Sequence, residues 1–340
     1  MKKPGFISSK SKLLASCPTN AAVMNLGDRL VDFSSPAYPL KPYQILHVGF
    51  HKRVDLKSRC CRSFFIKTRI ETVKACFNQI AQTLSNLLAL NQRDSSWIDA
   101  VDEARRVVFS AFNQIAFHVD PNLLSPGLVS DVESFSTLEN TCDECVVTLK
   151  AQHLRREFLC IGNTINEQVL LENAVLILST VASSGNMFLR FEKFKAVIID
   201  EAAQLVESAL LISLRTCTKK LILVGDPQQL PATVLSSLAK HRGYSRPLFQ
   251  RIIDCQNENL VNLLIWQYRM HPSISKFPCT TFYQGKILDH ESTFSKDWRE
   301  FVSMEDRQLH RVMGSNVFVD VRFCEEIDNN SRSFFNSGEA

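Results

Sequence analysis

Two apolar runs that each end in carboxylates constrain the fold of this chain more than any other feature. The first, V-I-I-D-E-A-A-Q at residues 197–204, leads through two adjacent carboxylates into a helix-like stretch. The second, L-I-L-V-G-D-P-Q-Q-L-P at residues 221–231, follows at the interval expected for one crossover helix. Short apolar runs of this kind are typical of strands buried on both faces, and the strand, helix, strand order favours a parallel sheet. We therefore expect the two acidic strand ends to lie side by side.

Further apolar runs at residues 13–17 and 174–178 have the same strand-like character and end in small polar residues. Helix-like stretches at residues 21–31 and 202–214 complete the alternation of a doubly wound sheet. Ligands of such sheets bind at the carboxyl ends of the strands. We expect this edge of the sheet to carry the side chains of Thr19, Thr180, Glu201 and Asp226.

A long helical stretch separates the run at 13–17 from the run at 174–178. Between residues 54 and 171, apolar residues recur at helical spacing, as in the series Ile70, Val73, Cys76, Ile80 and Leu84. Proline and glycine at positions 121, 126 and 127 predict a loop between helical segments. We interpret this stretch as a helical insertion. After residue 285 the pattern weakens and leaves one apolar run, at residues 317–321.

Adjacent carboxylates at a strand end have a specific chemical use. In ATPases of this architecture, one carboxylate holds Mg²⁺ and a second orients or deprotonates the attacking water. Asp200 suits the metal and Glu201 suits the water. Acidic residues before a helix are, by themselves, explained equally well by the helix dipole. The second acidic strand end, Asp226 followed by the amides Gln228 and Gln229, favours the phosphate-handling interpretation.

A third polar cluster, Q-Y-R-M-H-P at residues 267–272, follows the apolar run at 260–266. Arg269 is suited to clamp a phosphate, and the ring of Tyr268 to stack on a base. Read in isolation, such a cluster is more often an ordinary helix start.

The three clusters, in this order and at these intervals, resemble motifs II, III and IV of the superfamily 1 RNA/DNA helicases of the senataxin-like (Upf1-like) group. The likeness extends to C-P-T-N-A-A-V at residues 17–23, which resembles motif Ia, to L-S-T at 178–180, which resembles the strand called Ic, and to F-Y-Q-G-K-I-L at 282–288. It covers about two thirds of the chain. The resemblance implies a RecA-like parallel sheet of the P-loop NTPase type with a helical insertion, followed by the beginning of a second RecA-like domain.

The resemblance also implies domain limits. Residues 1–53 would form the first part of the first RecA-like domain, with motif Ia. Residues 54–171 would be the helical insertion, the variable subdomain or prong of that group. Residues 172–290 would complete the first domain, with motifs Ic, II, III and IV, and residues 291–340 would be a linker and the start of the second domain.

The resemblance assigns ATP and Mg²⁺ as cofactors. Asp200 would coordinate Mg²⁺, Glu201 would position the hydrolytic water, and Gln229 would sense the γ-phosphate beside Asp226. Arg269 would contact the γ-phosphate, so that it joins Asp200 and Glu201 as a catalytic residue. Tyr268 would lie against the adenine.

Nucleic acid would bind the other face of the motor. Side chains suited to hydrogen-bonding the sugar-phosphate backbone, where sequence is not read, are Thr19, Asn20, Thr180 and Thr233. The family moves along single-stranded RNA or DNA in the 5′ to 3′ direction, and an RNA–DNA hybrid is left open as a substrate. We expect weak, sequence-indifferent binding with a preference for single strands.

The chain departs from the family in one respect. It contains no G-x-x-x-x-G-K followed by Ser or Thr, the loop whose backbone amides cradle phosphates. We expect a fragment truncated at both ends of the motor, which hydrolyses no ATP by itself. The alternatives are a catalytically inactive nucleic-acid-binding or regulatory remnant of such a helicase, and a relic without a stable fold.

Bulk properties agree with a folded protein of the cell interior. The hydrophobic fraction of 45% excludes a disordered chain, and the formal charge of +4 is compatible with a nucleic-acid groove but does not demand one. No apolar run approaches the roughly 18 residues needed to span a bilayer. We expect no membrane association and a nuclear or cytoplasmic location.

The 11 cysteines are scattered, which is typical of reduced thiols. Cys142 and Cys145, with His153 further on, have half the ligands of a zinc site. We interpret them, and the pair Cys60 and Cys61, as ordinary thiols, and leave metal binding by Cys142 and Cys145 open.

Overall fold

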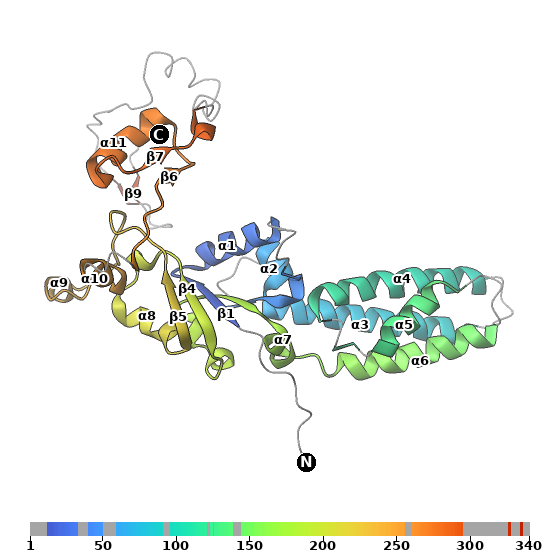
Figure 1. The fold of residues 1–340 in the computed structure, drawn as a ribbon. Helices are drawn as coiled ribbons and strands as arrows, with labels where there is room; N and C mark the ends of the chain where they lie inside the picture. Colours follow the sequence, from blue (N-terminus) through green and yellow to red (C-terminus); the bar gives the residue numbers. More distant parts are fainter. Residues whose placement is uncertain are drawn as a thin grey trace. The chain divides into compact units, whose positions relative to one another are not determined.

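The computed structural model describes residues 12–32, 40–49, 59–90, 96–120, 123–124, 126–138, 144–255 and 260–294, and the short pairs 326–327 and 334–335. The chain divides into two compact units, residues 1–256 and 257–340, which are described separately (Figure 1). The expected domain boundary, between residues 290 and 291, lies further along the chain than this division. The apolar run at 317–321 lies outside the described residues.

A five-stranded parallel sheet forms the centre of the first unit. Its strands are β1 (Leu13–Cys17), β2 (Ile45–Val48), β3 (Leu176–Thr180), β4 (Phe194–Ile199) and β5 (Cys217–Leu223), in the spatial order β2-β3-β1-β4-β5. This confirms the expected α/β class and the parallel sheet. Every residue of β3 is buried, as expected for an interior strand, whereas β5, one of the two edge strands among those described, exposes Lys219 and Lys220.

The sequence-based expectations differ from the sheet in three places. Strand β2, I-L-H-V, was not predicted. Strand β3 begins at Leu176 rather than at residue 174, because Ala174 still caps the preceding helix. The helix expected at 202–214 is two elements, a 3₁₀ turn η6 (Ala202–Gln204) and α8 (Glu207–Leu214), since Val206 between them has extended backbone angles.

Among the described residues, six helices lie between β2 and β3, which confirms a helical insertion. They are α2 (Arg59–Phe64), α3 (Ile66–Ala89), α4 (Trp97–His118), α5 (Pro126–Ser136), α6 (Glu144–Gly162) and α7 (Glu167–Asn173). Helices α3 to α6 run beside one another as a bundle (Figure 1). The buried face of α3 holds Val73, Cys76, Phe77, Ile80 and Leu84 at helical spacing, so the bundle core is the apolar stripe seen in the sequence.

Arg69, in the first turns of α3, ties the bundle to the sheet. Its buried guanidinium donates hydrogen bonds to the carbonyl oxygen of Ile45 at 2.6 Å, where β2 begins, and to that of His118 at the end of α4. Burial lowers the pKa of Arg69 to about 9. Burial also lowers the pKa of His47 and of His118 to about 4, and for His118 the charge of Arg69 adds to the effect. The buried guanidinium of Arg69 therefore lies beside the neutral imidazole of His118, and His47 in β2 is a second buried, neutral imidazole.

Helix α1 (Asn20–Asp32) follows β1 and contacts α2. Gly27 allows this contact, because a β-carbon there would stand 2.1 Å from the Sγ of Cys60, which is fully buried. Helices α9 (Ser237–His241) and α10 (Leu248–Asp254) end the first unit. Among the described residues, no helix is long and apolar enough to cross a lipid bilayer.

The described part of the second unit is small. Strands β6 (Trp266–Gln267) and β7 (Leu288–Asp289) pair in parallel, and α11 (Pro272–Tyr283) lies between them in the sequence. The 3₁₀ turn η8 (Glu291–Thr293) follows β7. Two further short strands, β8 (Glu326–Ile327) and β9 (Phe334–Phe335), pair antiparallel.

Candidate functional site

The strand register brings the polar strand ends to one edge of the sheet. Cys17 at the end of β1 pairs with Thr180 at the end of β3, and Ile199 of β4 pairs with Leu223 of β5. The backbone N–H of Asp200 donates to the carbonyl oxygen of Ser16 in β1 at 2.9 Å. The residues that follow β1, β3, β4 and β5 therefore meet at the carboxyl edge, and the expected neighbourhood of the two acidic strand ends is confirmed.

Asp200 and Glu201 form a tight, strained turn. Glu201 has a φ of 53° and is one of two non-glycine residues with a left-handed backbone among those described. Such a conformation costs a residue with a β-carbon roughly 1–2 kcal/mol. The Glu201 N–H donates to Oδ1 of Asp200 at 3.0 Å, and Nε2 of Gln204 donates to Oε2 of Glu201 at 3.0 Å. The turn thus holds two carboxylates in fixed and different directions.

Cys17 lies beneath this turn. Its side chain is fully buried, and its pKa is raised to about 12 by burial and, to a smaller extent, by the negative charges of Asp200 and Glu201. The thiol therefore stays protonated at neutral pH, so Cys17 is not a nucleophile here.

The loop after β5 is organised by Asp226. Its Oδ1 accepts the backbone N–H of Gln228 at 2.9 Å, and its Oδ2 accepts Nε2 of Gln229 at 2.9 Å. Gly225 permits close contact with the neighbouring turn, because a β-carbon there would lie 3.0 Å from the backbone nitrogen of Ala203. The acidic loops after β4 and β5 are thus in backbone contact, and the side chain of Gln229 is exposed above them.

The four expected nucleic-acid contacts differ in how available their polar groups are. Thr19 is exposed and its Oγ1 accepts the N–H of Ala22 at 3.2 Å, so it caps α1, while Asn20 beside it is half-buried. Thr180 is buried, and its hydroxyl donates to Oγ of Ser183 at 2.8 Å. Thr233 is exposed between two buried neighbours. Thr19 and Thr233 present polar atoms to solvent, whereas Thr180 is engaged inside the protein.

In the second unit, Gln267 shapes the loop that holds Tyr268 and Arg269. Its Oε1 accepts the backbone N–H groups of Arg269 at 2.9 Å and Met270 at 2.8 Å, and its Nε2 donates to Oδ1 of Asp289 at 2.6 Å. The side chains of Tyr268 and Arg269 are both exposed. Tyr268 and Arg269, adjacent in the sequence, therefore both lie on the surface of this unit.

The site fits its expected cofactors in part. Mg²⁺ is usually held in phosphoryl-transfer sites by one or two carboxylates together with substrate phosphates, which matches the half-buried Asp200. No described group of three or more His, Cys, Asp or Glu side chains could hold a metal without such help. For the phosphates of ATP, the described residues offer Gln229 and its loop, while an amide cradle of the G-x-x-x-x-G-K type is absent from the sequence.

The cysteine pair considered for zinc cannot be judged as a pair, because Cys142 lies outside the described residues. Cys145 is exposed, and Nε2 of His153 lies 3.1 Å from Oδ2 of Asp131. His153 is thus engaged with a carboxylate.

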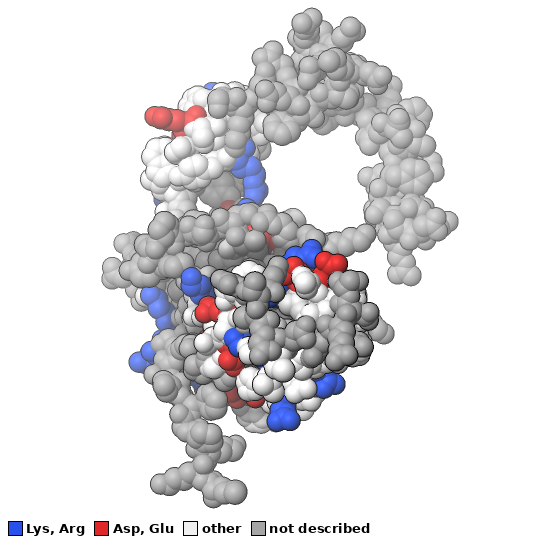
Figure 2. Space-filling view, turned by 90° about the vertical axis from the view of Figure 1, so that its right-hand side faces the viewer, with Lys and Arg blue, Asp and Glu red and all other residues white. Residues whose placement is uncertain are grey.

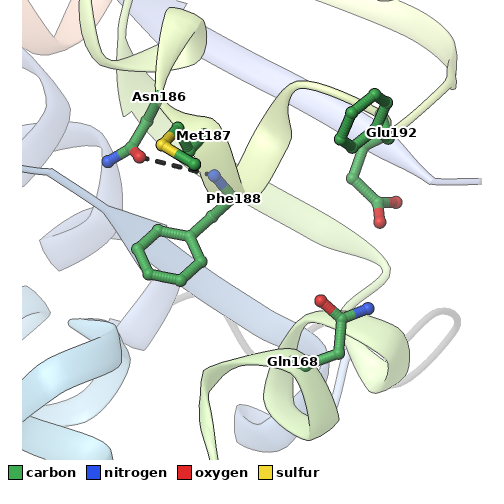
Figure 3. A pocket seen from close by; sticks show the side chains of 6 residues that line it. Gln168, Asn186, Met187, Phe188 and Glu192 are labelled. Atoms are coloured by element: carbon green, nitrogen blue, oxygen red, sulfur yellow. Dashed lines mark hydrogen bonds between the residues drawn. The ribbon is translucent and has the colours of Figure 1, made fainter.

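A cavity in the described part of the first unit lies apart from these residues. It has a volume of about 440 Å³ and is lined by Gln168, Asn186, Met187, Phe188, Phe191 and Glu192 (Figure 3). Asn186 accepts the backbone N–H of Phe188 at 3.4 Å, and Gln168 approaches from α7. None of the predicted site residues lines this cavity.

Charges of both signs are mixed on the described part of one face. Figure 2 shows Lys and Arg side chains interspersed with Asp and Glu over the described part of one face. This distribution agrees with the modest net charge of +4.

Several proteins named as helicases are similar to this chain in sequence. The chain is 43% identical over 162 residues to "Probable helicase MAGATAMA 3" of Arabidopsis thaliana, covering 46% of this chain and 18% of that protein. It is 29% identical over 296 residues to "Helicase sen1" of Schizosaccharomyces pombe, covering 85% of this chain and 17% of that protein. It is 38% identical over 127 residues to "ATP-dependent helicase upf1" of the same yeast, covering 37% and 14% of the two chains.

Two family models, each described as an AAA domain, match residues 6–237 and 244–340, and the first covers more than half of the chain. The chain belongs to the Upf1-like superfamily 1 helicases of the senataxin-like group. Its five-stranded parallel sheet is the RecA-like helicase domain of this family, followed by the start of a second domain. This helicase chain spans less than a fifth of the length of each of the three relatives named above.

Sequence reasoning missed several residues that contact the predicted site residues. Gln204 holds Glu201, and Ser183 holds Thr180. Asp289 and His290 contact the loop of Tyr268. Gln204 belongs to the D-E-A-A-Q cluster and could have been included on that ground, whereas no local pattern marks the other three.

Proposed function

We propose that this chain forms part of the motor of an ATP-dependent helicase that moves 5′ to 3′ along single-stranded RNA or DNA. The observation that carries the proposal is the contact between the two acidic loops. It places Asp200, Glu201 and the Asp226–Gln229 pair at one edge of a parallel sheet. We assign residues 1–53 and 172–256 to the first RecA-like domain, residues 54–171 to its insertion, and the second unit to the start of the next domain.

We propose a different role in hydrolysis for each of the two adjacent carboxylates, Asp200 and Glu201. Asp200 would hold Mg²⁺, whose role is to neutralise the charge that develops on the phosphates. Glu201 would orient and deprotonate the attacking water. Glu201 has a left-handed backbone, and its carboxylate accepts a hydrogen bond from Gln204. We propose that the carboxylate of Asp200 serves the metal while that of Glu201 serves the water. Gln229, held by Asp226, would sense the γ-phosphate.

Two residues of the second unit are proposed to contact ATP. Arg269 would stabilise charge on the γ-phosphate, and Tyr268 would lie against the adenine. Both side chains are exposed, as contact with a ligand requires. Along the strand ends of the first unit, Thr19, Asn20, Thr180 and Thr233 would contact the nucleic-acid backbone. An RNA–DNA hybrid is a further candidate substrate, and we propose a nuclear or cytoplasmic location.

The test is ATP hydrolysis. These 340 residues lack the phosphate-binding loop, so we expect them to show no turnover above background. In a polypeptide that also carries a G-x-x-x-x-G-K-S/T loop, Glu201→Gln should abolish hydrolysis and leave ATP binding nearly intact. Arg269→Ala should slow hydrolysis by roughly 10³-fold.

A matched control is Glu207→Gln, which makes the same chemical change on α8, where Glu207 pairs with Arg251 on the surface. We expect the control to turn over normally. A Glu201→Gln variant as active as the control would refute the assignment of the water to Glu201.

A second candidate function, a catalytically inactive nucleic-acid-binding or regulatory module, is favoured by the absent phosphate-binding loop. Under this alternative, the loop-bearing polypeptide still binds single strands but hydrolyses no ATP with or without Glu201. Binding and hydrolysis measured on the same sample therefore separate the two functions.

A further inference from the structure

Two consecutive residues of the second unit, Asp289 and His290, contact the loop that carries Tyr268. Strands β6 and β7 are parallel neighbours, and their register places Gln267 opposite Asp289. The backbone N–H of His290 donates to the carbonyl oxygen of Gln267 at 3.1 Å. The end of β7 is therefore fixed directly beside the residue that precedes Tyr268.

Asp289 orients the side chain of Gln267. Its Oδ1 accepts Nε2 of Gln267 at 2.6 Å and the hydroxyl of Ser275, which is buried in α11, also at 2.6 Å. A carboxylate accepts only, so it selects the NH₂ end of the Gln267 amide and turns Oε1 toward the loop. There Oε1 accepts the N–H of Arg269 at 2.9 Å. Asp289 thus orients the side chain of Gln267, and Gln267 in turn holds the backbone of Arg269.

His290 supports the ring of Tyr268. The two ring centroids are 4.5 Å apart with an interplanar angle of 38°. The His290 ring is itself held, because Nδ1 accepts the backbone N–H of Ser292 at 3.2 Å and Trp266 contacts it edge-on with centroids 6.2 Å apart. The side chain of Tyr268 nevertheless remains 56% exposed. A ring supported on one face and exposed elsewhere is suited to stack on a flat aromatic ligand.

We propose that Asp289 and His290 are positioning residues for the nucleotide base. They hold Tyr268 so that one ring face rests on His290 and the other receives the base. The inference rests on the proposed function, in which Tyr268 lies against the adenine. Stacking depends on ring area and not on the hydrogen-bond pattern of the base, so we expect Tyr268 on His290 to bind nucleoside triphosphates as a class. Purines, which have the larger ring area, should bind more tightly than pyrimidines.

The experiment uses saturation-transfer NMR on the full 340-residue chain with millimolar ATP, GTP or CTP and Mg²⁺ as probes. We expect transfer to the base protons to be stronger for ATP and GTP than for CTP. Transfer should fall at least threefold in His290→Ala and in Asp289→Ala. It should recover in His290→Phe, which keeps a flat ring, and in Asp289→Asn, whose amide oxygen still accepts. Lys276→Ala, an exposed change on α11, is the control and should leave transfer unchanged.

A second readout needs no nucleotide. In the chain labelled with 3-fluorotyrosine, the ¹⁹F resonance of Tyr268, assigned with Tyr268→Phe, should move in His290→Ala and return toward its original position in His290→Phe. This resonance reports the contact between the Tyr268 ring and the ring at position 290. If His290→Ala only lowered the general stability of the protein, the resonance would not return in the phenylalanine variant.

The outcomes separate the two proposals. If Tyr268→Ala leaves transfer unchanged, the proposed contact of Tyr268 with the base is wrong. If Tyr268→Ala removes transfer but His290→Ala does not, the proposed function survives and the inference is overturned. An unmoved ¹⁹F resonance in His290→Ala also overturns the inference, and absence of transfer in the unaltered chain overturns both.

Discussion

Gly225 lies so close to Ala203 that a β-carbon at position 225 would stand 3.0 Å from the Ala203 backbone nitrogen and 3.1 Å from that of Ala202. The neighbouring N–H of Ala202 donates to the carbonyl oxygen of Val224 at 2.8 Å. The loop after β5 and the turn after β4 therefore share a backbone interface with no space for a side chain. Any group larger than hydrogen at position 225 must separate the two carboxylate-bearing loops.

Gly225→Ala should destabilise the first unit by about 1–3 kcal/mol, because the atoms that would have to move belong to the backbone. Urea unfolding measures the change. Gly127→Ala is the control, since a β-carbon there meets nothing within 4 Å and alanine in a helix gains about 0.5–1 kcal/mol. Equal stability of the two variants would show that the interface tolerates a methyl group.

Glu201→Gly should make the protein more stable than Glu201→Ala by on the order of 1 kcal/mol, because glycine adopts the left-handed backbone without steric cost. Gln284, at the end of α11, has a φ of 55° and provides the matched comparison. Gln284→Gly should likewise exceed Gln284→Ala in stability. If the alanine and glycine variants were equally stable at position 201 but not at position 284, the turn at Glu201 would carry no strain.

Stability should fall as the pH drops from 6.5 toward 4, because His47 and His118 have folded-state pKa values of about 4, below their ordinary 6.5. Between these pH values the histidines of the unfolded chain take up protons, while those of the folded chain do not. The two histidines therefore make their full contribution to the free energy of unfolding above pH 6.5. By pH 5 the loss should reach about 2 kcal/mol for each histidine.

The measurement for these histidines is urea unfolding at pH 7 and pH 5. His47→Phe and His118→Phe should each reduce the difference in unfolding free energy between pH 7 and pH 5. This holds whatever the stability of each variant at pH 7. The control is His241→Phe on the exposed helix α9. A pH dependence that persists unchanged in the double variant would mean that other groups cause it.

Single-stranded RNA or DNA should bind the chain more tightly than duplex, and added salt should weaken binding. Thr233→Val should weaken binding about five-fold, the effect of one hydrogen bond, regardless of sequence. Thr180→Val is the comparison and should change affinity less, since the Thr180 hydroxyl bonds to Ser183. Filter binding at two salt concentrations tests this, and tighter binding to duplex would contradict the proposed backbone contacts.

The sheet was predictable wherever an apolar run stands alone. Strand β1 coincides with the expected residues 13–17 because Pro18 ends the run sharply. Strand β2 was missed because four residues that include a histidine carry little pattern. His47 is buried where β2 pairs with β3 and where its ring contacts Phe65. The break before α8 was missed because Leu205 and Val206 continue the apolar pattern through it.

The site was predictable in its location but not in its geometry. Asp200 and Asp226 follow recognisable strands, so their shared edge could be inferred. The left-handed Glu201 could not be inferred, because D-E-A-A is also typical of a helix start and no residue type in that run requires a positive φ. The contact of Tyr268 with His290 joins residues from two strands whose pairing no local pattern shows.

The placement of the helical bundle between β2 and β3 has a consequence for synthesis. Strand β1 pairs with β3 and β4, so residues 13–17 have no strand neighbour until residues 176–180 have been made. Helices α3 to α6 contact one another within residues 66–162, and such local contacts form quickly. On the ribosome, the bundle can therefore fold while the buried strands β1 and β2 are still unpaired, because the strands that they pair with have not been made. Translation speed and chaperone access across residues 49–176 then govern how much chain reaches the native sheet.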